Sequence, residues 1–165
     1  MEFGLFMMPL HPPYRSYADS YDRDLALLVE ADRLGFHEAW IGEHLTERWE
    51  NAPCPDLLIA KASALTQQIT LATGITLLPI HNPVELAHRI AMLDHLTRGR
   101  FYWGIGHRAI PTDLALFGLD PKQGEAVREQ AAEVLDIVLK IWANEGPFRY
   151  HGKYFTIEAP ELDAV

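Results

Sequence analysis

Short apolar segments alternate along the chain with longer segments in which apolar residues recur at helical spacing. Residues 2–8 form a nearly continuous apolar stretch that runs into a proline, which is typical of a buried strand in a parallel sheet. Residues 20–35 carry leucines on one helical face, with Ser20 as the expected cap and Gly35 as the expected stop. The start of the chain therefore predicts one strand followed by one helix.

The same alternation recurs three more times. Short stretches rich in apolar, β-branched and aromatic residues predict strands over residues 36–42, 69–78 and 100–105. Helical spacing predicts helices over residues 55–67, 82–98 and 120–143. The last two begin with a capping side chain followed by proline, at Asn82-Pro83 and Asp120-Pro121. Four βα units are therefore expected.

A small hairpin over residues 148–157, turning at His151-Gly152, should follow these units. Four successive βα units predict a parallel sheet, either an open doubly wound sheet or part of an eightfold βα barrel of the TIM type. Such barrels need roughly 250 residues, whereas the chain has 165. We expect a single domain over residues 1–165 that forms about the first half of a barrel, with the carboxyl-terminal half absent from this chain.

Charge and composition narrow the class of protein. Asp and Glu number 23 against 14 Lys and Arg, and no basic run interrupts this excess, which disfavours nucleic-acid and anionic-membrane partners. No apolar run approaches the roughly 20 residues that span a bilayer. The first residues include Glu2 and no basic residue, which is not typical of a secretory leader, and the single Cys54 fits a reducing compartment. We expect a cytoplasmic protein.

Candidate chemistry lies in the loops that follow the predicted strands, because parallel α/β folds place their functional residues there. Each of the four loops contains a histidine, the side chain best suited to proton transfer near neutral pH: His11, His44, His81 and His107. His44 is the strongest candidate because it directly follows Glu43, although neighbouring strand residues point to opposite faces. A metal site is disfavoured, since the spacing of these residues matches no compact metal-binding motif.

Two glycine segments allow more than one interpretation. Residues 104–109, Gly-Ile-Gly-His-Arg-Ala, fit a variant of the dinucleotide-binding fingerprint, but Pro111 follows in place of a regular helix and the unit is the fourth along the chain. Alternatively, Gly104 and Gly106 let a flat ring or a phosphate approach the backbone, with Arg108 balancing negative charge. Gly74, inside a predicted strand, indicates either a close ligand or a tight crossing of the chain with itself.

Several short segments occur together in a characteristic order and spacing. They are Phe3-Gly4-Leu5-Phe6, Ala31 through Gly35-Phe36, Trp40-Ile41-Gly42-Glu43-His44, Leu71-Ala72-Thr73-Gly74, Leu78-Pro79, Asn82-Pro83, Leu93-Asp94, Arg98-Gly99-Arg100-Phe101, Gly104-Ile105-Gly106 and Phe117-Gly118. Taken together, these segments resemble the bacterial-luciferase-like flavin monooxygenases over nearly the whole chain. The family fold is an eightfold βα barrel that holds reduced flavin mononucleotide (FMN), or in some branches a deazaflavin, at the carboxyl face of its strands.

The resemblance also implies roles for individual residues. His44 corresponds to the family's catalytic histidine, and Gly74-Ile75 to a non-proline cis peptide that packs against the flavin ring. The remaining expected cofactor contacts are Glu43, Thr76, Gly106, His107 and Arg108. The expected neighbours of the substrate are Met7, His11 and Leu78.

The implied reaction uses reduced FMN, supplied by a separate flavin reductase, and molecular oxygen to insert one oxygen atom into a small organic substrate. One alternative keeps the fold but transfers a hydride from a reduced deazaflavin. A second is a non-catalytic half-barrel that binds flavin or dimerises. The resemblance further implies a homodimer formed through the helices at residues 56–67 and 83–97, whose alanines permit close approach.

Overall fold

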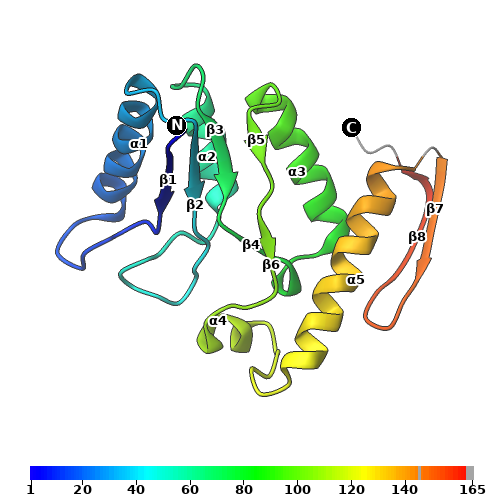
Figure 1. The fold of residues 1–165 in the computed structure, drawn as a ribbon. Coiled ribbons are helices and arrows are strands. Elements are labelled where there is room, and N and C mark those ends of the chain that lie inside the picture. Colours follow the sequence, from blue (N-terminus) through cyan, green and yellow to red (C-terminus); the bar gives the residue numbers. More distant parts are fainter. Residues whose placement is uncertain (145, 163–165) are drawn as a thin grey trace. The chain divides into compact units, whose positions relative to one another are not determined.

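The computed structural model describes residues 1–144 and 146–162, in which four βα units precede a hairpin (Figure 1). The strands are β1 (Gly4–Met7), β2 (Glu38–Ile41), β3 (Thr70–Thr73), β4 (Thr76–Leu77), β5 (Phe101–Tyr102), β6 (Ile105–Gly106), β7 (Gly146–His151) and β8 (Thr156–Leu162). The helices are α1 (Tyr17–Arg33), α2 (Pro55–Ser63), a 3-10 turn η1 (Leu78–Ile80), α3 (Pro83–Thr97), α4 (Pro111–Leu116) and α5 (Gly124–Trp142). The four predicted βα units and the hairpin follow one another in the predicted order.

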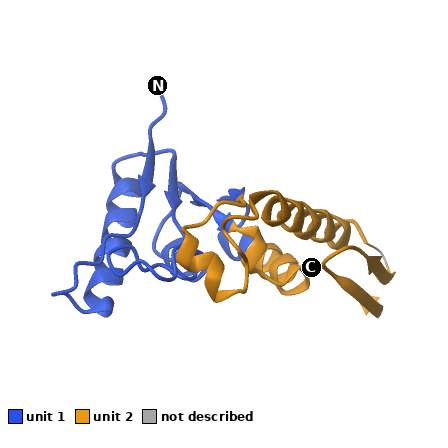
Figure 2. Cartoon of the chain, turned by 90° about the horizontal axis from the view of Figure 1, so that it is seen from below, with its two compact units in different colours: residues 1–76, 93–105 blue, residues 77–92, 106–165 orange. Residues whose placement is uncertain are grey.

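The described residues group into two compact units, coloured separately in Figure 2. Unit 1 comprises residues 1–76 and 93–105, and unit 2 comprises residues 77–92 and the chain from residue 106 onward.

A four-stranded parallel sheet in the order β1-β2-β3-β5 forms the centre of unit 1. Ala39, Ile41 and Leu71 are fully buried on one face of this sheet. The other face presents an aromatic row that runs from Phe6 through Trp40 to Tyr102, and Phe6 and Tyr102 are 62% and 46% exposed. The prediction that the first strand is buried throughout is therefore wrong, because only alternate side chains of β1 face the core.

The predicted cap of α1 is wrong, whereas the predicted start of α3 is confirmed. The cap of α1 is Ser16, whose Oγ accepts the amide of Asp19 at 3.1 Å, and the predicted cap Ser20 is instead buried one turn inside the helix. α3 starts as predicted, because Asn82 Oδ1 accepts the amides of Val84 and Glu85. No helix in the described part of the chain is both long and apolar enough to cross a membrane.

The expected start of α5 at Asp120-Pro121 is also wrong. Asp120 Oδ1 accepts the amide of Lys122 at 2.9 Å and closes a separate turn, so that the helix begins only at Gly124. The short helix α4, which begins at Pro111, was not predicted. A side chain that can cap a helix can equally close a tight turn, and the local sequence does not distinguish the two outcomes.

Each of the two strands predicted over residues 69–78 and 100–105 is divided in two. β3 ends at Thr73, the chain passes through Gly74 and Ile75, and β4 then leads directly into η1. β5 and β6 are likewise separate, and β6 pairs with β4 in a second, two-stranded sheet. The strand ends that carry the candidate site are therefore short and irregular.

In unit 2, α5 buries the predicted apolar stripe together with Ile137; the buried residues are Val127, Ala131, Val134, Ile137, Val138 and Ile141. The predicted hairpin is present as the longer antiparallel pair β7–β8. The carboxylate of Glu133 on α5 holds the turn of this hairpin by accepting hydrogen bonds from the amides of Lys153, Tyr154 and Phe155 at 2.8–3.0 Å.

Two oppositely charged side chains hold the turn between α2 and β3 in unit 1. The carboxylate of Asp32 accepts the backbone amides of residues 67, 68 and 69 at 2.7–2.9 Å. The guanidinium of Arg100 donates to the carbonyls of Ser63, Thr66 and Ile69 at 2.9–3.3 Å. Burial would raise the pKa of the Asp32 carboxyl, but the three amide hydrogen bonds and Arg100 outweigh this effect and lower the pKa.

Replacing Asp32 by Asn should lower the free energy of unfolding by about 2–4 kcal/mol, because the neutral amide cannot accept all three backbone hydrogen bonds and buried donors are left without partners. Urea unfolding followed by circular dichroism measures this change. The matched control is Asp22→Asn, which removes an exposed carboxylate 3.8 Å from Lys61 and should change the free energy by less than about 0.5 kcal/mol.

The lowered pKa of Asp32 also predicts how the stability difference between wild type and Asp32→Asn changes with pH. Because the folded-state pKa of Asp32 lies below its unfolded value of about 3.9, its contribution is fully present above that value and is lost as the pH falls through the folded-state pKa. The stability gap between wild type and Asp32→Asn should therefore stay constant at higher pH and narrow below about pH 4. Equal losses for Asp32→Asn and Asp22→Asn would contradict the assigned role.

Candidate active site

The loop that follows β2 carries His44 at its base. His44 and Ala52 form an antiparallel bridge in which each amide donates to the other's carbonyl, at 3.2 and 3.1 Å. Within the loop, Asn51 Nδ2 donates to the carbonyl of Leu45 at 3.2 Å. The backbone of His44 is therefore held on both sides by hydrogen bonds.

The imidazole of His44 is partly accessible and lies near a carboxylate. Its side chain is 18% exposed, and its Nε2 is 3.9 Å from Oε2 of Glu50. Glu43, the carboxylate expected beside it, is buried, with 4% exposure. Glu50 was not predicted, because only the closure of the loop by the His44–Ala52 bridge brings it back toward His44. An imidazole with a nearby carboxylate can hold and transfer a proton.

The end of β3 carries the predicted cis peptide. The Gly74–Ile75 bond is cis, which confirms that expectation. The carbonyl of Gly104 accepts hydrogen bonds from both sides of this bond, from Thr73 Oγ1 and from the Thr76 amide, each at 2.8 Å. Trp103 Nε1 also donates to Thr76 Oγ1 at 3.1 Å. The segment is therefore held in place by residues 103 and 104 of the neighbouring strand region.

The protein's own packing requires glycine at residue 104 and leaves little room for a side chain at residue 74. A Cβ on Gly104 would overlap the carbonyl oxygen of Thr73 and lie 2.9 Å from Cζ3 of Trp40. A Cβ on Gly74 would lie 3.0 Å from Cε2 of Phe6 and 3.1 Å from Cβ of Trp40. At Gly104, the contact that needs glycine is therefore a tight crossing of the chain with itself, whereas Gly74 is closely packed against side chains of β1 and β2.

Unit 2 contains a cavity of about 610 Å³ between the loop after β6, helix α4 and the start of α5. Polar and charged side chains on its wall include His107, Arg108, Glu125 and Arg128. Two guanidinium groups against one carboxylate leave an excess of positive charge, which suits an anionic group such as a phosphate. The helix after residues 104–109 begins only at Pro111, so the glycine-rich turn does not open a helix as the dinucleotide fingerprint requires.

The other histidines singled out in the loops have different surroundings. His11 is 1% exposed, and its Nε2 lies 2.7 Å from Oδ2 of Asp24. His81 Nδ1 lies 3.2 Å from Nη2 of Arg89. Among the described residues, no three His, Cys, Asp or Glu side chains are arranged to hold a metal ion.

The three residues expected beside the substrate are all buried: His11, Met7 and Leu78, the last two with 6% and 3% exposure. Because His11 is buried and paired with Asp24, these contacts favour a structural role for it in unit 1. Contact of Met7 or Leu78 with a substrate stays a prediction.

Replacing Gly104 by Ala should lower the free energy of unfolding by about 2–4 kcal/mol, because the added methyl group meets a backbone oxygen that cannot rotate away. The control is Gly124→Ala at the start of α5, where a Cβ meets no atom within 4 Å. That substitution should leave stability unchanged or raise it slightly. Thermal unfolding compares the two variants, and a similar midpoint for both would contradict the packing argument.

The fold and the strand-end residues define the class of protein: a parallel βα protein with a candidate acid–base residue at the carboxyl end of one of its strands. The sequence profile of the family described as "Luciferase-like monooxygenase" matches residues 1–164. The chain therefore belongs to the luciferase-like monooxygenase family.

A curated relative is the 4-hydroxyprotoasukamycin monooxygenase of Streptomyces nodosus subsp. asukaensis. It is 40% identical over 162 residues, which cover 98% of this chain and 43% of the relative. The chain thus spans less than half the length of that relative.

Two solved structures define the fold further. The oxygenating constituent of 3,6-diketocamphane monooxygenase from Pseudomonas putida, a type II Baeyer-Villiger monooxygenase in complex with FMN, matches with a TM-score of 0.91 and 37% identity over 98% of this chain and 44% of its own. A coenzyme F420-dependent secondary alcohol dehydrogenase matches with a TM-score of 0.82 at 20% identity, over 99% of this chain and 48% of its own, which is a similarity of fold alone. The predicted fold class, the first βα units of a barrel of the TIM type plus a small hairpin, is confirmed.

Proposed function

We propose that the protein to which this chain belongs is an FMN-dependent monooxygenase that uses reduced FMN and molecular oxygen to oxygenate a small organic substrate. The observation that carries this proposal is the similarity, in fold and in sequence, to the FMN-bound oxygenating constituent described above. In the overall reaction, one oxygen atom enters the substrate, the other leaves as water, and reduced FMN is oxidised. The reduced flavin supplies the two electrons that activate oxygen.

Several side chains and backbone groups of the chain have the chemistry to bind parts of FMN. The cationic wall of the unit 2 cavity, with His107 and Arg108, suits the phosphate. In unit 1, we assign Glu43 and the segment Gly74-Ile75-Thr76 to contacts with the flavin ring. Gly106 is assigned to the cofactor on the resemblance alone.

His44 is proposed as the acid–base residue. Its partly exposed imidazole can accept a proton from the substrate or return one to it, and the carboxylate of Glu50 lies 3.9 Å from its Nε2. The backbone of His44 is hydrogen-bonded to Ala52 at the base of the loop, which restrains the position of the imidazole.

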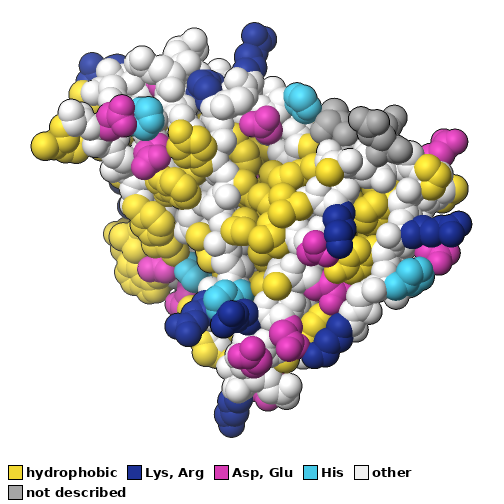
Figure 3. All heavy atoms as spheres, turned by 45° about the vertical axis from the view of Figure 1, so that its right-hand side comes forward, with side chains coloured by type: hydrophobic (Ala, Val, Ile, Leu, Met, Phe, Trp, Pro, Cys, Tyr) yellow, Lys and Arg dark blue, Asp and Glu magenta, His cyan; other side chains and the backbone are white. Residues whose placement is uncertain are grey.

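The aromatic row on the open face of the unit 1 sheet supports a larger assembly. Phe6 and Tyr102 are large apolar side chains that are exposed in this chain. Apolar side chains also gather in the middle of the face drawn in Figure 3. We propose that residues 1–165 form one domain equivalent to the first half of a barrel and that the other half of the barrel covers the row in the whole protein.

We further propose a cytoplasmic protein that receives reduced FMN from a separate reductase and forms a homodimer. The alanines expected to form the dimer surface do not all lie on it, because Ala62 and Ala87 are fully buried in their own chain. Leucines instead make the outer faces of α2 and α3 apolar: Leu57 and Leu96 are 68% and 52% exposed.

Replacing Leu57 by Asp should therefore weaken self-association, because a carboxylate would have to be desolvated at an apolar contact. Light scattering on the wild-type protein at micromolar concentration should give twice the mass of one chain, and the variant should give a smaller mass. Asp22→Asn, on the exposed side of α1, serves as the control and should leave the mass unchanged. A monomeric wild-type protein would refute the homodimer.

Replacing His44 by Ala should lower kcat for oxygenation by about 10²–10⁴-fold while the Kd for FMN changes little, because acid–base catalysis contributes about this much and the ring is not required for binding. Product formation is measured by mass spectrometry with reduced FMN, oxygen and a panel that includes bicyclic ketones. The matched control is His37→Ala, at the opposite end of β2 and exposed to solvent, which should retain wild-type turnover.

Three outcomes would count against the proposal. Unchanged kcat in His44→Ala would remove its assigned role. Tight binding of a deazaflavin with hydride transfer, in place of FMN-dependent oxygenation, would move the protein to the alternative activity. Flavin binding without turnover across the panel would favour the non-catalytic half-barrel.

A further inference from the structure

The loop that carries His44 is tied to neighbouring elements of unit 1 at two of its backbone carbonyls. The hydroxyl of Tyr21 on α1 donates to the carbonyl of Asn51 at 3.1 Å. The amide of His11, in the loop after β1, donates to the carbonyl of Trp49 at 2.6 Å. Asn51 directly precedes Ala52, the residue that bridges to His44. The position of the loop is therefore coupled to groups that lie outside it.

Tyr21 is itself fixed by a buried polar cluster. Its ring packs edge-on against the ring of His11, with centroids 4.8 Å apart and planes at 86°. His11 lies 2.7 Å from Asp24, one turn further along α1 from Tyr21. Burial and the nearby Asp24 carboxylate raise the pKa of Tyr21, so its phenol stays protonated and acts as a hydrogen-bond donor.

Burying the carboxylate of this cluster carries an electrostatic cost. Burial raises the pKa of Asp24 against the opposing effect of its hydrogen bond to His11, which means that enclosing the carboxylate is unfavourable. Replacing a buried polar pair by apolar side chains of similar volume is often neutral or stabilising. The cluster does fix the position of Tyr21, because the Tyr21 ring packs against the imidazole that Asp24 holds.

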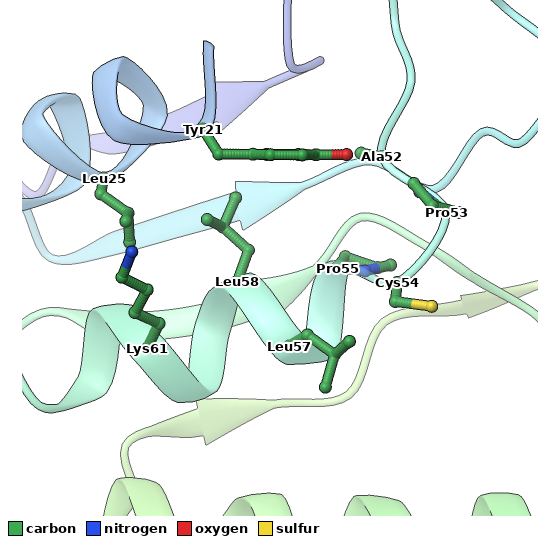
Figure 4. Close-up of a pocket in the computed structure, with 9 residues that line it drawn as sticks. All are labelled: Tyr21, Leu25, Ala52, Pro53, Cys54, Pro55, Leu57, Leu58 and Lys61. Atoms are coloured by element: carbon green, nitrogen blue, oxygen red, sulfur yellow. The ribbon is translucent and has the colours of Figure 1, made fainter. Parts of the chain in front are cut away.

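The packing around Tyr21 makes its hydrogen bond more important. An apolar cavity of about 330 Å³ lies beside it, lined by residues of α1, of the end of the loop and of α2. Figure 4 shows the Tyr21 side chain extending from α1 toward Ala52, along the edge of this space. Because the cavity leaves the end of the loop without close packing on this side, the hydrogen bond from Tyr21 supplies a restraint that packed side chains would otherwise supply.

We propose that Tyr21, supported by His11 and Asp24, is a positioning residue that holds the loop of residues 45–51 so that Glu50 stays opposite the imidazole of His44. The catalytic meaning of this position rests on the function proposed above. The mechanical coupling of Tyr21 to the loop does not, and it can be measured in the protein without flavin or substrate.

The test compares Tyr21→Phe with Tyr17→Phe. Tyr17 lies one turn before Tyr21 on α1, stacks on it with centroids 6.5 Å apart, and is 51% exposed. Both substitutions remove a single hydroxyl group, but only the first removes a hydrogen bond to the loop. Amide hydrogen exchange of His44 and Ala52, followed by NMR, reports on opening of the bridge between them.

In Tyr21→Phe, these two amides should exchange about fivefold faster, the factor that corresponds to a net hydrogen bond of about 1 kcal/mol. The amides of Leu71 in β3 and of Gly74, which directly follows β3 and donates to the carbonyl of Ile41, should be unaffected, as should all four amides in Tyr17→Phe. Asp24→Asn should also accelerate exchange at His44 and Ala52, because it weakens the support of His11.

Unchanged exchange at His44 and Ala52 in Tyr21→Phe would refute the proposal. Equal acceleration of the loop and sheet amides would refute it too, because that result describes a general loss of stability. If local loosening is observed, Tyr21→Phe should lower kcat for oxygenation at least twofold with the Kd for FMN unchanged. Local loosening in a protein that never oxygenates any substrate would refute only the proposed function.

Discussion

The turn between α2 and β3 is the constraint on which the rest of unit 1 depends. Asp32 binds three backbone amides of this turn and Arg100 binds three of its carbonyls, so opposite charges from separate segments hold the start of β3. β3 pairs with both β2 and β5. Because a slip of one residue would exchange the two faces of the sheet, this turn also decides where the strands end and which residues emerge there.

The candidate site of unit 1 follows from that register. β2 delivers Glu43 and His44 at its carboxyl end, and β3 delivers the cis peptide at Gly74. Hydrogen bonds outside the strands also hold both segments. The carbonyl of Gly104 accepts hydrogen bonds from both sides of the cis peptide, and the hydroxyl of Tyr21 donates to the loop that follows His44. Hydrogen bonds to the backbone carbonyls of Gly104 and Asn51 thus hold these two segments in place.

The fold was largely predictable because its cues are short-range. The apolar stripe of α5 needs only periodicity, and Asn82 at α3 needs only its own amide neighbours. The helix starts predicted at Ser20 and Asp120 are wrong because the local sequence is ambiguous there. A serine or an aspartate can cap a helix, lie buried or close a tight turn equally well. The exposed face of β1 was missed because a run of apolar residues does not reveal which faces of a strand are covered.

The sequence by itself determined the order of the elements, the identity of His44 as a candidate and, through the family resemblance, the cis peptide at Gly74-Ile75, since these depend on residue type and order. Tertiary structure alone decided that Glu50 lies near His44, that Gly104 is needed by the oxygen of Thr73, and that His11 pairs with Asp24. Those contacts join residues through the folded chain, so their distances depend on register and loop closure, which residue order does not encode locally.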